Sequence, residues 1–249
     1  MSSQSAPAPE APAPGKGEFA RLAGVLTDPK VAFADIVVHP RWWVPLALVV
    51  VLAIVYMATY SRHVGWEGYM RHTIETSSRT QNLPVEQRER IIEQQTRLAP
   101  VFGYVMAAVG MPIVALVTAA VLLFVFKLML DAQLTFRQVF AVTCYSFLTG
   151  VLSVALSILV MFLKNPEDFN LQDPLGAHLG SLLDPEAAPK WLAALASSFD
   201  LFTLWTMLLL ATGLSVAARK LSWGKSLAGV VAPWVVWVAV KVGWRAIFG

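Results

Sequence analysis

The sequence predicts an all-α integral membrane protein with five transmembrane helices, preceded by short interfacial amphipathic helices. Two observations lead to this fold class. First, 57% of the 249 residues are hydrophobic and only 14% are charged, whereas soluble domains carry about a quarter charged residues. Second, the chain contains several long apolar runs, of which the clearest is "SSFDLFTLWTMLLLATGLSV" at residues 197–216. Such runs are long enough to cross the hydrocarbon core of a bilayer.

The composition also argues against several other classes of protein. Lysine and arginine are scattered and are not interleaved with aromatic residues in a basic patch, so we expect no nucleic-acid partner. Cys144 is the only cysteine, which leaves no internal disulfide and no thiolate metal cage. Neither an HExxH pair nor a serine nucleophile elbow occurs. We therefore expect no catalytic residues, no cofactor and no metal.

The N-terminal region divides into a tail and two short amphipathic segments. Residues 1–17 alternate alanine and proline, which predicts a disordered tail. Between residues 18 and 40, apolar side chains recur at helical spacing on either side of Asp28-Pro29. Each segment is too short to span a bilayer, so we expect both to lie in the interface with their apolar faces against the lipid. Trp42 and Trp43 mark the membrane boundary.

Residues 18–249 form one predicted membrane domain. Its five spans cover about residues 43–60, 101–126, 139–163, 199–218 and 226–248. The first has 18 residues and would be roughly 27 Å long. The polar stretch before the second span contains a predicted extramembrane helix at 84–98, with Pro84 in its first turn. An acidic, proline-rich loop at 164–190 separates the third and fourth spans.

Five spans place the two termini on opposite sides of the membrane. Short loops and residues that flank the spans weigh most in the positive-inside rule. The tight turn "RKLSWGK" therefore belongs in the cytoplasm, and the acidic loop at 164–190 suits the opposite side. This predicts an inner-membrane protein with a cytoplasmic N-terminus and its C-terminus on the opposite side.

The third span carries a stripe of small and polar residues. Ser146, Thr149, Gly150, Ser153 and Ser157 recur on one side of the predicted helix. Small residues let helices approach closely and hydroxyl groups bond across the contact, so we favour a helix-packing seam. The alternative is the lining of a water path. Seams of this kind serve within a chain and between chains, so a homo-oligomer is compatible with the sequence.

Three ionisable residues form a predicted intramembrane polar cluster. Asp200 falls at the start of the fourth span, and Lys241 and Arg245 share one side of the fifth, near the same membrane face. An ionisable group at membrane depth is costly alone, so we expect Asp200 to pair with Lys241 or Arg245. A structural clamp is the favoured interpretation, and a proton- or ion-coupling site is the alternative.

Three stretches resemble the Yip-one (Ypt-interacting protein) membrane-domain family in its bacterial form. They are "LTDPKVAFADIVVHPRWWVPL" at 26–46, "TFRQVFAVTCYSFL" at 135–148 and "SSFDLFTLW" at 197–205. The resemblance implies a five-span helical domain with a cytoplasmic N-terminus. Eukaryotic members are associated with small prenylated GTPases and vesicle traffic. This chain lacks their long cytoplasmic N-terminal domain, so the resemblance carries over the architecture more than the function.

The predicted function is that of a non-enzymatic scaffold which organises the membrane or a partner protein. Its partners would be the lipid bilayer and a membrane or peripheral protein, contacted through the segments at 18–40 and 84–98. The alternative is a small transporter or channel component with Asp200, Lys241 and Arg245 on its path. A transporter needs a hydrated cavity that reaches Asp200, whereas a scaffold needs only a dry polar contact.

Overall fold

Helices make up most of the described chain. The computed structural model describes residues 17–76, 80, 82–184 and 187–248. The tail predicted at residues 1–17 lies outside these residues, apart from Gly17. In chain order the helices are α1 (Glu18–Thr27), α2 (Pro29–Val38), α3 (Trp43–His63), α4 (Glu67–Thr76), α5 (Val85–Phe124), η1 (Val125–Met129), α6 (Phe136–Ser146), α7 (Leu148–Leu163), η2 (Pro166–Asp168), η3 (Leu179–Leu182), α8 (Lys190–Ala196), α9 (Leu201–Ala218) and α10 (Trp223–Phe248).

Five helical segments of the described chain are long and apolar enough to cross a membrane. They are α3, α5 with η1, α6 with α7, α9, and α10. The predicted fold class is therefore confirmed. The third span is not one continuous helix: α6 ends at Ser146, and α7 begins at Leu148 after a turn at Phe147.

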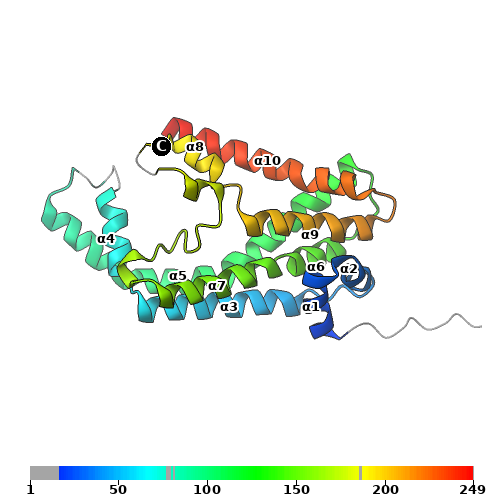
Figure 1. The fold of residues 1–249 in the computed structure, drawn as a ribbon, viewed down its shortest axis with the longest axis horizontal. Helices are drawn as coiled ribbons and strands as arrows, with labels where there is room; N and C mark the ends of the chain where they lie inside the picture. The colour runs from blue at the N-terminus through cyan, green and yellow to red at the C-terminus, as the bar shows by residue number, and fades with distance from the viewer. Residues whose placement is uncertain (1–16, 77–79, 81, 185–186, 249) are drawn as a thin grey trace, which may run out of the picture.

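The spans run back and forth along the long axis of the molecule, which is horizontal in Figure 1, and connect its two ends. We call one the hairpin end; it carries α1, α2 and the turns at 130–135 and 219–222. We call the other the loop end; it carries α4, α8 and the loop at 164–184. Helix α1 and the last turn of α10 lie at opposite ends, as an odd number of spans requires.

The second span is part of a much longer helix than the sequence predicts. The expected extramembrane helix at 84–98 and the span at 101–126 are joined into α5, which runs from Val85 to Phe124 with Pro100 and Pro112 inside it. Forty residues of helix are about 60 Å long, roughly twice the thickness of the hydrocarbon core. The first turns of α5 therefore project beyond the spans at the loop end, where α5 packs against α4.

The two N-terminal helices form a hairpin that packs on the bundle. Asp28 caps α2 by accepting a hydrogen bond from the Val31 amide, and Pro29 occupies the first turn. The side chains of Phe33 and Ile36 are fully buried, and α2 packs against α6 and α9. The prediction that these apolar residues face lipid is therefore wrong: α6 and α9 cover them.

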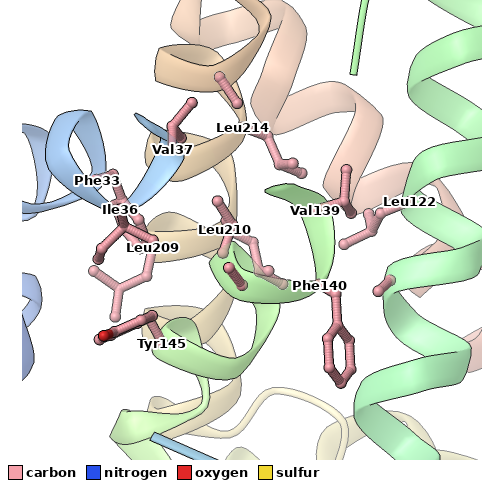
Figure 2. Close-up of a cluster of buried hydrophobic side chains, with 14 of the residues drawn as sticks. Phe33, Ile36, Val37, Leu122, Val139, Phe140, Tyr145, Leu209, Leu210 and Leu214 are labelled. Atoms are coloured by element: carbon pink, nitrogen blue, oxygen red, sulfur yellow. The ribbon is translucent and has the colours of Figure 1, made fainter. Parts of the chain in front are cut away.

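The main core lies at the hairpin end (Figure 2). It is a cluster of buried side chains from four helices. They are Phe33, Ile36 and Val37 of α2, Leu209, Leu210 and Leu214 of α9, Val139, Phe140 and Tyr145 of α6, and Leu122 of α5. A fully buried Phe or Ile side chain contributes about 1.5–3 kcal/mol relative to exposure to water. A smaller core lies toward the loop end, around Tyr60, Trp66, Met161 and Phe169. The two clusters fix the hairpin and α4 to opposite ends of one bundle.

Candidate functional site

Asp200 occupies the N-cap of α9. Its Oδ1 accepts hydrogen bonds from the Thr203 amide at 2.8 Å and from the Thr203 hydroxyl at 3.1 Å. The unpaired amides at the start of a helix favour an acceptor in this position, and the positive end of the helix dipole favours a carboxylate. The Asp200 carboxylate is therefore satisfied within its own helix.

Lys241 bonds to serines just before Asp200 rather than to Asp200 itself. Its Nζ donates to Ser197 Oγ at 3.0 Å and to Ser198 Oγ at 3.1 Å. Arg245 is exposed, and within the described chain neither cation forms an ion pair with Asp200. The predicted Asp200–Lys241 or Asp200–Arg245 pair is thus wrong. The helix begins at Leu201, which gives Asp200 backbone donors, and the junction of α8 with α9 gives Lys241 nearer acceptors.

The acidic loop is attached to the start of α9 by backbone pairing. The Leu179 amide donates to the Phe199 carbonyl at 3.2 Å, and the Leu201 amide donates to the Ala177 carbonyl at 3.0 Å. These two bonds make an antiparallel bridge between His178 and Asp200. Within the loop, His178 Nε2 lies 2.9 Å from Asp173 Oδ2. The loop therefore folds back over the polar junction that Lys241 contacts.

The predicted seam contributes a polar contact between helices at one of its positions. Thr149 is buried, and its hydroxyl lies 2.5 Å from the hydroxyl of Thr206 in α9. Ser157 is also buried but donates to the Ser153 carbonyl in its own helix. Ser146 is fully buried, whereas a Cβ added to Gly150 would meet no atom within 4 Å. Both ends of the stripe are therefore buried, and the direct polar contact with another helix lies at Thr149.

A buried ionic cluster that sequence reasoning missed holds the hairpin in place. Arg21 is only 1% exposed, and its Nε donates to Asp35 Oδ2 at 2.6 Å. Its Nη1 donates to Glu18 Oε1 at 3.2 Å and to the His39 carbonyl at 3.3 Å. Tyr145 of α6 donates its hydroxyl hydrogen to Glu18 Oε2 at 2.7 Å. We call Glu18, Arg21, Asp35 and Tyr145 the hairpin cluster.

The electrostatics of the hairpin cluster favour a charged Arg21. Burial acts to lower the pKa of the Arg21 guanidinium, but the hydrogen bond and charge of Asp35, with the charge of Glu18, raise it above its ordinary value. The sequence carries one signal for this cluster. Glu18, Arg21 and Val25 lie on one side of α1, so an ion pair at i, i+3 adjoins an apolar position.

Two surface cavities lie toward the loop end. The larger, about 720 Å³, is lined by residues of α3, α4 and the loop at 164–172, including Tyr60, Arg71 and Phe169. The second, about 460 Å³, is lined by residues including Thr59, Arg62 and Phe162. Neither cavity is lined by Asp200, Lys241 or Arg245. Among the described residues, no group of three or more His, Cys, Asp or Glu side chains is placed to hold a metal ion.

The comparison with protein families agrees with this architecture. The Yip1 domain matches residues 23–244, which is nearly the whole chain and includes the α1–α2 hairpin and all five spans. Searches among curated proteins and among solved structures found no match. The extent of the family match, together with the five apolar helices, shows that this chain is a multi-pass membrane protein of the Yip1 domain family.

Proposed function

We propose that this protein is a non-enzymatic scaffold of the inner membrane that binds a membrane or peripheral protein through its α1–α2 hairpin. The observation that carries the proposal is the way in which the hairpin is held. Buried apolar side chains and the hairpin cluster fix it to the bundle, while its outer surface exposes Phe19, Val31 and Val38. A pre-ordered surface binds a partner without first losing conformational entropy.

We further propose that the hairpin end faces the cytoplasm. Its exposed cations outnumber the described carboxylates at the same end, and cytoplasmic loops carry an excess of Lys and Arg. The exposed cations at the hairpin end are Lys30, Arg41, Lys127, Arg137, Arg219, Lys220 and Lys225. The described carboxylates at this end are Glu18, Asp28, Asp35 and Asp131.

The first turns of α5 would offer a second contact surface on the other side of the membrane. They project at the loop end, where Arg71 of α4 donates to Glu89 at 2.7 Å and braces the two helices. A scaffold with a contact surface at each end would hold a cytoplasmic partner and a partner on the opposite side of the membrane next to each other.

The transport alternative rests on a polar path through Asp200. The Asp200 carboxylate caps its own helix, and the two cavities described above are lined by other residues. These contacts favour a structural role for Asp200, so the scaffold is the function that we put forward.

The test is affinity capture of the full-length protein in nanodiscs, followed by mass spectrometry of the proteins that co-purify. We expect a stoichiometric partner with the wild-type chain and its loss from the double variant Phe19→Ser/Val31→Ser. A matched control is Val236→Ser, which alters an exposed side chain on α10. A protein that purifies without a partner but retains a small ligand would contradict the scaffold and favour transport.

A further inference from the structure

Lys241 is a cation inside an apolar span with no carboxylate beside it among the described residues. It lies in the span Trp223–Ile247, roughly 9 Å before the end of that span at 1.5 Å per residue. Its contacts are the hydroxyl oxygens of Ser197 and Ser198. A charged side chain at this depth is costly unless a partner or the interface satisfies it, and two neutral hydroxyls do not balance its charge.

The two serines orient the ammonium group and leave one of its donors free. Each serine donates its own hydrogen to the Ala194 carbonyl, at 3.1 Å for Ser197 and 2.8 Å for Ser198. Their lone pairs are thus directed to Lys241. An ammonium group has three donors, and the two serines occupy two of them. The third remains available to an acceptor from outside the described chain.

Arg245 adds a second cation that has no partner among the described residues. It follows Lys241 by four residues, so both side chains lie on one side of α10. Arg245 is exposed and forms no ion pair or hydrogen bond with a described residue. The nearest predicted counter-ion, Asp200, already accepts two hydrogen bonds from Thr203. Two cations one helical turn apart near the loop end of α10 therefore lack an anion among the described residues.

We propose that Lys241 and Arg245 bind the phosphate of an anionic phospholipid at the loop end of α10. A guanidinium group matches phosphate oxygens in a two-pronged arrangement, and a lysine ammonium adds a point charge. Trp244, which precedes Arg245 directly, is exposed near the same end of the span, and aromatic side chains favour the membrane interface. The site lies at the opposite end of the molecule from the hairpin and does not depend on the scaffold proposal.

The test uses the purified full-length protein and native mass spectrometry. Samples are compared after reconstitution with phosphatidylglycerol, with phosphatidylcholine, or in lipid-free detergent with inorganic phosphate. We expect the wild type to retain phosphatidylglycerol, and the double variant Lys241→Gln/Arg245→Gln to bind it about tenfold more weakly, because charge-assisted hydrogen bonds are lost. Arg62→Gln, an exposed arginine at the same end, is the matched control and should behave as the wild type.

Two further variants keep the test decisive if the double variant folds poorly. Arg245→Gln removes an exposed side chain without described contacts, so it should fold normally and weaken lipid binding. Lys241→Arg should retain binding because it keeps the charge. Equal retention of phosphatidylglycerol by wild type and Arg245→Gln would overturn the proposal. So would equal retention of phosphatidylcholine, or saturation of the site by inorganic phosphate alone.

Discussion

At the scale of single residues, Arg21 shows how one buried charge can organise a contact. Its guanidinium binds Asp35 of α2 and Glu18 of its own helix, and Glu18 in turn accepts from Tyr145 of α6. The three helices thus meet at one ionic cluster next to the apolar core. Removing one partner of a buried ion pair is more damaging than its net contribution suggests, because the other charge stays buried without compensation.

We therefore predict that Asp35→Asn destabilises the protein by about 3–5 kcal/mol. The variant removes the carboxylate closest to Arg21 while keeping nearly the same volume. Arg41→Gln is the control, because Arg41 is 61% exposed and its ion pair with Glu18 should contribute less than about 1 kcal/mol. Unfolding followed by tryptophan fluorescence in detergent measures both. Equal stability of Asp35→Asn and wild type would show that the cluster does not hold the hairpin.

Gly213 supports the same contact by its lack of a side chain. A Cβ at this position would lie 2.5 Å from Val142 Cγ1 and 3.0 Å from Phe33 Cδ1. We predict that Gly213→Ala costs about 1–3 kcal/mol through overpacking. Gly150→Ala should instead be neutral or stabilising by about 0.5–1 kcal/mol, because nothing lies within 4 Å of its added Cβ. Thermal unfolding of the two variants provides the comparison, and equal shifts would contradict it.

At the scale of elements, the contact between α4 and α5 includes a surface ion pair between Arg71 and Glu89. The hydrogen bond from Arg71 lowers the pKa of the Glu89 carboxyl below its ordinary value. A carboxyl with a lowered pKa in the folded state stabilises the fold above its unfolded pKa, and this stabilisation is lost as the pH falls through the folded pKa.

We predict that α4 becomes less protected from hydrogen exchange as the pH falls below about 4, the usual range of a glutamate. Hydrogen-exchange mass spectrometry of residues 67–76, corrected for the intrinsic pH dependence of exchange, measures this change. Glu89→Gln should raise exchange of this segment at neutral pH and remove its extra pH dependence. A response unchanged by that substitution would assign the pH dependence to other groups.

The membrane spans could be predicted from the lengths of the apolar runs in the sequence. The contacts between polar side chains were less predictable. The first span was expected at 43–60 and forms α3 at Trp43–His63, because an apolar run in a bilayer must satisfy its backbone as a helix. The hairpin contact was not foreseen. Helical periodicity identifies the apolar side of α2, but it does not distinguish lipid from α6 and α9 as the surface that covers it.

The candidate polar site illustrates the same limit. Sequence reasoning placed Asp200, Lys241 and Arg245 at one end of the bundle, and the contact of Lys241 with Ser197 and Ser198 agrees with that placement. The expected ion pair did not form, because a shift of the helix start to Leu201 turns Asp200 into a cap. Hydropathy does not fix the first residue of a helix to within two positions. Here the position of that first residue decides which groups interact with Asp200.

At the scale of the whole molecule, the proposed orientation places the two ends on opposite sides of the membrane, with the hairpin end in the cytoplasm. Single cysteines at Gln133 (hairpin end) and Asn170 (loop end), both exposed, can be introduced after Cys144→Ala. In intact spheroplasts a membrane-impermeant maleimide should label the Asn170→Cys variant and leave Gln133→Cys unlabelled until the membrane is opened. The reverse pattern would invert the proposed topology.

On the proposed function, the outer surface of the α1–α2 hairpin binds a partner protein. The most direct test of this claim is in-cell photocrosslinking with a photoreactive amino acid at Phe19 or Val31, and at Val236 and Leu159 as exposed control positions on α10 and α7. We predict a discrete protein adduct from the hairpin positions that is absent from the controls. Adducts at all four positions alike, or none at Phe19 and Val31, would contradict the claim.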